Sequence, residues 1–268
     1  MNSIIYFMVG IISTTVGALS GLGGGVIIKP VLDAFGQYDL GTIGILSAFT
    51  VFAMSIVSLG RSLAKGVKLE GQKTIALAIG SILGGTIGKN LFSIFVNALN
   101  NDLFAQRIQS ATLCLLMIIV LVLYNMEDKI KSKNSNKANK QDTSSIKVIL
   151  SCFIVGLLLG TVSAFLGIGG GPLNVIVLMY ILKMDVKSSA IHSIFIIFFS
   201  QGSKILTVLM NEGLSPYNLE VLPFMVVGGI LGGFLGSHLS SKLDKKAVKT
   251  SFKVCMILII FINFSNLF

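Results

Sequence analysis

The sequence predicts an all-α polytopic membrane protein. We expect two inverted-topology repeats of about five helical segments each, with a glycine-broken helix in each repeat. Of the 268 residues, 53% are hydrophobic and only 12% are charged, and the mean hydropathy is +0.88. Apolar runs of about 20 residues, the length with which an α-helix crosses a bilayer, recur along the chain. A motif with four glycines in five positions occurs twice, at Gly21–Gly25 and Gly167–Gly171.

The first predicted repeat covers residues 1–125. Residues 3–20 form an apolar run that measures about 27 Å as a helix and just spans a bilayer. Residues 24–36, beyond the first glycine motif, are too few to cross untilted, so this segment either spans at a tilt or is re-entrant. The remaining expected spans of this half are residues 40–60, 74–98 and 107–125.

A polar linker at residues 126–146 separates the halves and is expected in the cytoplasm. Its sequence from Glu127 to Ser145 consists mainly of Lys, Asn, Ser and Gln, so no fold is expected there. The second predicted repeat, residues 147–268, returns to the apolar pattern. Its expected segments are residues 147–166, 172–183, 187–210 and 218–239, and a last span that runs to residue 268.

The two halves align as an internal duplication. Gly21 matches Gly167 at an offset of 146, and Ser47 matches Ser193 at the same offset. Glycines at four-residue spacing also recur, in Gly80–Gly88 and in Gly228–Gly236, with six identities in nine positions. Small residues at this spacing let helices approach closely, so we expect these two glycine stripes to serve packing.

The basic residues predict the topology. Four loops hold 17 of the 21 Lys and Arg, and the positive-inside rule places all four in the cytoplasm. Matching loops of the two halves carry opposite charge character, as inverted repeats require. Both termini are then expected outside. The basic loops are residues 61–73, 126–147, 183–187 and 242–253.

The glycine motifs are candidate substrate sites. Glycine is a poor helix former, and irregular backbone at membrane depth occurs where it is buried in protein or lines a cavity. A helix that starts after such a break directs free N–H groups and its positive dipole end at an anion. Close helix packing is the alternative reading of the same glycines. The motif residues in the candidate site are Gly21, Gly23, Gly24, Gly25, Gly167, Gly169, Gly170 and Gly171.

Four polar side chains complete the candidate site: Lys29, Ser47, His192 and Ser193. Lys29 lies about one turn past the first break, where it would neutralise an anion. The two serines contact substrate or bond to their own helix backbone. His192 is read as a gating or proton-carrying group, a core residue or a cytoplasmic-edge residue.

Other ionisable groups receive weaker readings. Lys204 is a lesser candidate that otherwise snorkels to the membrane surface, and Lys89 is expected to pack or snorkel. Asp33 and Glu220 are expected at the membrane interface, so the energy source stays open among protons, sodium and passive flow.

The paired glycine breaks, each followed by a short apolar helix and a GxxxGGxxG stripe, resemble the TauE/SafE sulfite exporter family. Pro30 stands where the family has a proline after the first break, while Leu46 and His192 stand where it usually has threonines. The resemblance covers nearly the whole chain apart from the linker. It implies transport, often export, of sulfite, sulfonates or related small anions.

The sequence therefore favours a membrane transporter of a small anion, with a passive anion channel as the alternative. An intramembrane enzyme using Ser20 and a histidine is a remote alternative, because no catalytic acid is expected nearby. A scaffold or receptor role would leave both glycine breaks unexplained. The expected partners are a small anionic substrate and the lipid bilayer; a homodimer is compatible with this architecture, and neither nucleic acid nor a cofactor is expected.

Overall fold

The computed structural model of the chain describes residues 3–66, 71–99, 102–133, 146–168, 170–211 and 213–266. These residues form ten α-helices and no strand. Eight of the helices are long and apolar enough to cross a membrane. The predicted all-α polytopic fold is therefore confirmed. The helices are α1 (Ser3–Ser20), α2 (Gly25–Phe35), α3 (Leu40–Ala64), α4 (Gly71–Leu99), α5 (Asp102–Lys133), α6 (Ile146–Leu166), α7 (Gly171–Ile181), α8 (Val186–Asn211), α9 (Leu222–Lys242) and α10 (Lys245–Ser265).

The two glycine motifs separate a long helix from a short one in each half. α1 ends at Ser20 and α6 at Leu166, and the helices that follow them, α2 and α7, have 11 residues each. Positive φ angles interrupt both helices: 77° at Gly21 and 69° at Gly167. Side chains with a Cβ rarely adopt these angles, so glycine is the residue that allows each break.

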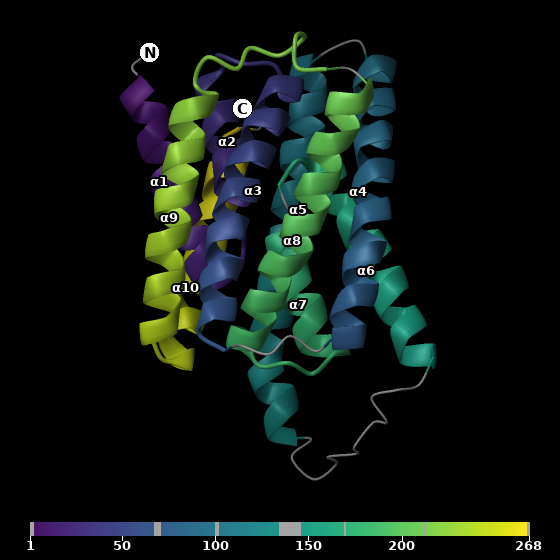
Figure 1. Cartoon of the computed structure of the whole chain (residues 1–268), viewed down its shortest axis with the longest axis vertical. Coiled ribbons are helices and arrows are strands. Elements are labelled where there is room, and N and C mark those ends of the chain that lie inside the picture. The colour runs from purple at the N-terminus through teal and green to yellow at the C-terminus, as the bar shows by residue number, and fades with distance from the viewer. Residues whose placement is uncertain are drawn as a thin grey trace.

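The helices form an upright bundle (Figure 1). Its two ends differ in charge. The α3–α4, α7–α8 and α9–α10 connections lie at one end, which we call the basic end because it carries the basic loops. α1 begins and α10 ends toward the opposite end, which we call the far end. This arrangement agrees with the expected grouping of the basic loops; their placement in the cytoplasm stays a prediction.

The glycine stripes pack against helices of the opposite half. Added Cβ atoms on the α4 stripe would overlap α6 backbone, and on the α9 stripe they would overlap α1 backbone. The expected packing role of the stripes is thus confirmed. The carbonyls approached by Gly80, Gly84 and Gly88 are those of Phe153, Leu157 and Thr161, and the carbonyls approached by Gly228, Gly232 and Gly236 are those of Phe7, Ile11 and Thr15.

These contacts match between the halves. Phe7 and Phe153 occupy equivalent positions of the duplication, as do Thr15 and Thr161. The first helix of each half therefore packs against the glycine stripe of the other half. This exchange agrees with the predicted duplication, and the inverted orientation of the two repeats stays a prediction.

α5 extends beyond the sequence expectation. It continues to Lys133, into the segment expected to be a linker without a fold. The residues from Met126 to Lys133 include Met, Glu and Lys, which favour helix, so the span continues past its apolar part. The rest of the expected linker, residues 134–145, lies outside the described residues.

Candidate functional site

The two glycine breaks meet inside the bundle. A Cβ on Gly25 would lie 2.7 Å from the carbonyl oxygen of Ile168, and a Cβ on Gly171 would overlap the carbonyl group of Leu22. These are equivalent contacts, because Gly25 corresponds to Gly171 and Leu22 to Ile168. The structure therefore brings together the two motifs that the sequence singles out, although 146 residues separate them.

Two buried serines hold the breaks together. The Ser193 hydroxyl donates to the carbonyl of Gly21 at 2.7 Å and lies 3.4 Å from that of Gly171. The equivalent Ser47 hydroxyl reaches the carbonyl of Gly167 at 3.5 Å. Each serine thus contacts the break of the opposite half, which neither of the two alternative readings of these serines foresaw. A direct contact between these serines and substrate stays a prediction.

Gly23 and Gly24 of the first break are both closely packed. A Cβ on Gly23 would lie 2.9 Å from the Ile197 side chain, and one on Gly24 would lie 2.7 Å from that of Thr14. The amide of Gly23 donates to the carbonyl of Gly17 at 3.2 Å, so that donor closes the end of α1. The first turns of α2 and α7 also contain backbone amides that have no partner within their own helix. Gly169 lies outside the described residues.

His192 is buried in α8 with 1% of its surface exposed. Its Nδ1 lies 2.9 Å from the carbonyl of Ser188, one turn earlier in the same helix. The reading of His192 as a cytoplasmic-edge residue stays a prediction, and so does its gating or proton-carrying role.

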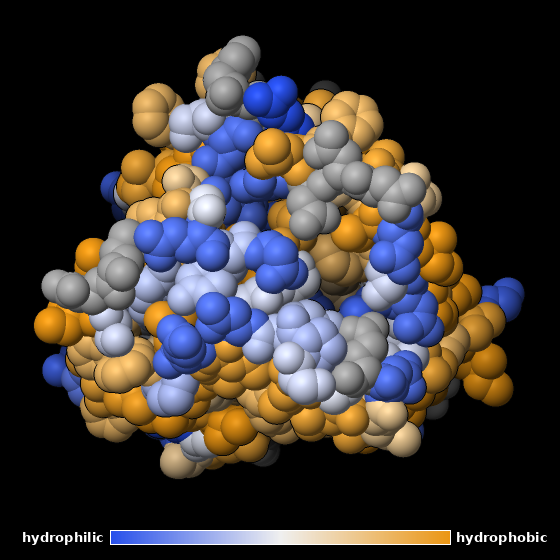
Figure 2. Space-filling view, turned by 90° about the horizontal axis from the view of Figure 1, so that it is seen from above, coloured by the Kyte–Doolittle hydropathy of each residue, from blue (hydrophilic) through white to orange (hydrophobic). Residues whose placement is uncertain are grey.

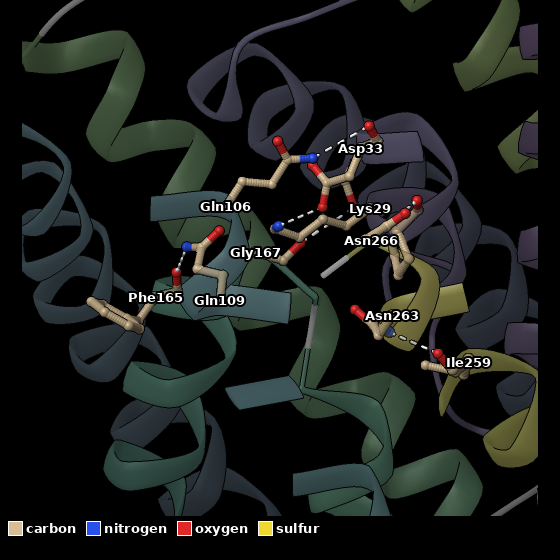
Figure 3. A network of polar contacts seen from close by, with 11 residues as sticks. Lys29, Asp33, Gln106, Gln109, Phe165, Gly167, Ile259, Asn263 and Asn266 are labelled. Carbon is tan, nitrogen blue, oxygen red and sulfur yellow. Dashed lines mark hydrogen bonds and ion pairs between the residues drawn. The ribbon is translucent and has the colours of Figure 1, made fainter. Parts of the chain in front are cut away.

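Lys29 is paired with Asp33 inside the bundle. Its Nζ lies 2.9 Å from Asp33 Oδ2, and the two side chains are 2% and 0% exposed. The i, i+4 spacing on α2 turns both side chains inward together. The expectation that Asp33 lies at the membrane interface stays a prediction. The stem of Lys29 would lie 3.5 Å from a Cβ on Gly167, which places this ion pair beside the second break (Figure 3).

Lys204 is a buried cation held by a neutral group. It is 4% exposed, and its Nζ donates to the carbonyl of Gly44 at 3.0 Å. The snorkelling reading of Lys204 is therefore wrong, because α3 supplies a carbonyl inside the bundle. Lys89 is also buried and donates to the Ser93 hydroxyl at 2.9 Å.

The second break also contains polar atoms without a partner, which sequence reasoning missed. Ser163 Oγ and both side-chain polar atoms of Asn174 are buried and form no hydrogen bond. A Cβ on Gly170 would lie 2.9 Å from Ser163 Oγ and 3.3 Å from Asn174 Oδ1, so both side chains adjoin the start of α7. The equivalent residues of the first half, Gly17 and Ile28, have no such groups.

This difference gives the second break its own chemistry. A buried polar group without a hydrogen bond costs about 1–3 kcal/mol, so a cluster of such groups in one place marks a point where a ligand can form the missing bonds. The signal in the sequence was an asparagine one turn into an otherwise apolar helix, at Asn174.

A pocket at the far end leads toward the Lys29–Asp33 pair. It has a volume of about 330 Å³, and Asp33, Tyr38, Asp39 and Gln106 are among its lining residues. The Gln106 side-chain amide also donates to the Asp33 carbonyl at 3.3 Å. Seen from above, hydrophilic residues gather over the middle of this end and hydrophobic residues surround them (Figure 2). The pocket gives this end a polar approach to the site.

Comparison with known proteins agrees with this architecture. The family model described as sulfite exporter TauE/SafE matches residues 6–263. The chain is 26% identical over 259 residues to the probable membrane transporter protein YunE of Bacillus subtilis, covering 86% of this chain and 87% of that protein. It is 30% identical over 203 residues to the probable membrane transporter protein MJ0441 of Methanocaldococcus jannaschii, covering 72% and 66% respectively. No solved structure matches the chain. The eight apolar spans and this family match together show that the chain is a multi-pass membrane transporter of the TauE/SafE sulfite exporter family.

Proposed function

We propose that this transporter carries a small anion, such as sulfite, a sulfonate or a related sulfur oxyanion, through the centre where the two glycine breaks meet. The observation that carries the proposal is Lys204, a buried ammonium group that donates a hydrogen bond to the neutral carbonyl of Gly44. A buried charge is costly unless it is paired, so a bound anion stabilises this position. The family match supports sulfite within this class.

Lys29 has a different role in the proposal from that of Lys204. Asp33 already neutralises it, so Lys29 is not the anion's counter-charge. The first turns of α2 and α7 add backbone donors at their positive dipole ends. Asn174 and Ser163 supply further hydrogen-bonding groups at the second break.

The contacts between the breaks favour a carrier over a passive channel. Gly171 packs against the Leu22 carbonyl and Gly25 against that of Ile168, so packed backbone lies between the two ends of the bundle. An anion that crosses must separate these contacts. A carrier that opens to one end at a time has this property, and a continuously open pore lacks it.

Flux measurements in proteoliposomes test the proposal. Sulfite, methanesulfonate, sulfate and acetate are compared for the wild type, Lys204→Gln and Lys204→Arg, with Lys246→Gln as the control for an exposed lysine. We expect saturable oxyanion flux that Lys204→Gln lowers at least about tenfold, because a buried charged hydrogen bond is lost. Lys204→Arg keeps the charge and should retain more flux.

Two outcomes would contradict the proposal. Unchanged flux in Lys204→Gln would show that this lysine does not serve the anion. Flux that is not accelerated by anion on the opposite side of the membrane would favour the passive channel. Elution of each variant as a single folded species is checked before reconstitution.

A further inference from the structure

A second cationic pocket lies at the basic end of the bundle. It has a volume of about 240 Å³ and is formed by the last turn of α1, the end of α3, the start of α8 and the end of α9. Its cations are Arg61, Lys65 and Lys187, its lining includes four serines, and no carboxylate is among its lining residues. We call it the basic vestibule. Cations and hydroxyls without a carboxylate are the groups that bind an oxyanion.

Arg61 is fixed in position within this vestibule. Its guanidinium carbon lies 3.9 Å from the centre of the Phe234 ring, and its Nη2 lies 2.9 Å from Nδ1 of His238. Its Nε is buried and has no hydrogen-bond partner. The contacts with α9 hold the guanidinium in place while one of its donors is unused. A planar group of this kind suits two oxygens of one oxyanion.

The vestibule reaches the first glycine break. Ala190 lines it, and a Cβ on Gly21 would overlap Ala190. Ser193, one turn further along α8, donates to the Gly21 carbonyl. An anion in the vestibule therefore lies one layer of packing away from the place where the breaks meet.

The internal duplication relates the vestibule to the region around Lys204 and Lys89. Ala190 corresponds to Gly44, whose carbonyl binds Lys204, and Ser237, which lines the vestibule, corresponds to Lys89. The vestibule and the region around Lys204 are thus equivalent parts of the two halves, although their cations stand at positions that do not correspond. A path between the ends passes one cationic group before the breaks and another after them.

We infer that the basic vestibule is a binding site for a small oxyanion, which the transporter collects there from the basic end before the breaks separate. The inference rests on the proposed transport. The ligand is a compact anion with at least two oxygens, of the size of sulfite or sulfate, held by Arg61, whose Nε is the unused donor. The lining hydroxyls that already donate to carbonyls of their own helices are those of Ser62, Ser237 and Ser241. Lys65 and Lys187 raise the local anion concentration at the entrance.

The test is calorimetric binding of sulfite, and separately of sulfate, to the full-length protein in neutral detergent at constant ionic strength. The variants are Arg61→Gln and Lys187→Gln, and Lys246→Gln is the matched loss of a lysine at the same end outside the vestibule. We expect Arg61→Gln to weaken binding at least about tenfold, because a charged hydrogen-bonding group is lost. Lys187→Gln should weaken it less, and Lys246→Gln should leave it within about twofold of the wild type.

Several results would overturn the inference. No binding to the wild type, or equal binding by Arg61→Gln and the wild type, would each do so. If Arg61→Gln fails to fold, equal binding by Lys187→Gln and Lys246→Gln decides against the vestibule. A further arm measures association of the wild type and Arg61→Gln with phosphatidylglycerol and phosphatidylcholine vesicles. If Arg61→Gln weakens only the association with phosphatidylglycerol and leaves sulfite binding unchanged, the site binds a lipid headgroup.

The same variants separate this inference from the proposed function. Lys204→Gln should lose flux while its sulfite binding in the vestibule remains. Arg61→Gln should raise the half-saturating sulfite concentration at the basic end and keep most of the maximal rate. Binding without any flux in the wild type would refute transport and leave the vestibule standing.

Discussion

The Lys29–Asp33 pair shows why a buried cation is not by itself an anion site. Both side chains are enclosed, and the 2.9 Å contact makes each the other's counter-charge. A pair of this kind contributes little net stability when compared with apolar packing. Removing one partner nevertheless leaves the other as an unpaired buried charge, which is strongly destabilising. Lys204, on a different helix, differs from Lys29 because its described hydrogen bond goes to a neutral carbonyl and not to a carboxylate.

At the residue scale we therefore predict a non-additive effect. Lys29→Gln should lower the free energy of unfolding by about 3–5 kcal/mol, because Asp33 is left as an unpaired buried charge. The double variant Lys29→Gln/Asp33→Asn should recover most of that loss. Thermal unfolding in detergent measures both. Equal stability of the single and double variants would contradict the pairing.

Sequence reasoning found part of the site and missed part of it for identifiable reasons. The glycine breaks, Ser47 and Ser193 were predictable because they recur at one offset. The pairing of Lys29 with Asp33 was readable from their i, i+4 spacing on a short helix. The burial of Lys204 was not, because it depends on the Gly44 carbonyl of α3, a contact across 160 residues.

At the element scale, the helix pairs α4–α6 and α1–α9 owe their closeness to glycine. Neither pair has room for a methyl group at the stripe positions. The attraction comes from close van der Waals packing, since lipid tails are as apolar as the helices themselves. In both pairs the stripe glycines contact equivalent residues of the partner helix, so equivalent substitutions in the two halves should have similar effects.

We predict that Gly84→Ala and Gly232→Ala each lower the free energy of unfolding by about 1–3 kcal/mol, because overpacking separates the helices. Gly60→Ala is the matched control: this glycine lies in α3 with nothing within 4 Å of its added Cβ. Alanine should stabilise that helix by about 0.5–1 kcal/mol through its propensity. Denaturant titration compares the three, and a neutral Gly84→Ala would rule out the packing role.

The helix boundaries beside the two glycine motifs were the most predictable feature of the elements. α1 begins and ends where its apolar run does, because lipid exposure penalises any polar interruption. α5 differs, since the helix formers from Met126 onward continue it beyond the membrane. Hydropathy reports only the apolar part of a helix and therefore placed its end too early.

At the scale of the whole molecule, the two ends of the bundle should face opposite compartments. Lys65 lies at the basic end, and Ser215, in the α8–α9 connection, lies at the far end; both are exposed. The native cysteines Cys114, Cys152 and Cys255 are buried, which keeps background labelling low.

We therefore predict that an impermeant thiol reagent added to intact cells modifies Ser215→Cys and leaves Lys65→Cys unmodified until the membrane is opened. The opposite pattern would invert the assigned topology. Labelling of both from the same side would contradict the inverted repeat. The α4–α5 connection should label from the same side as Ser215.

The exchange of first helices has a consequence for biosynthesis. When the ribosome has completed α4, the glycine stripe of this helix has no native partner until α6 is made. The native partner of α1 is made later still, because it is α9. The early helices must therefore stay inserted in the bilayer as separate spans. A fragment that ends at Lys133 should be captured by membrane quality control when expressed alone, and rescued when residues 146–268 are supplied as a second polypeptide.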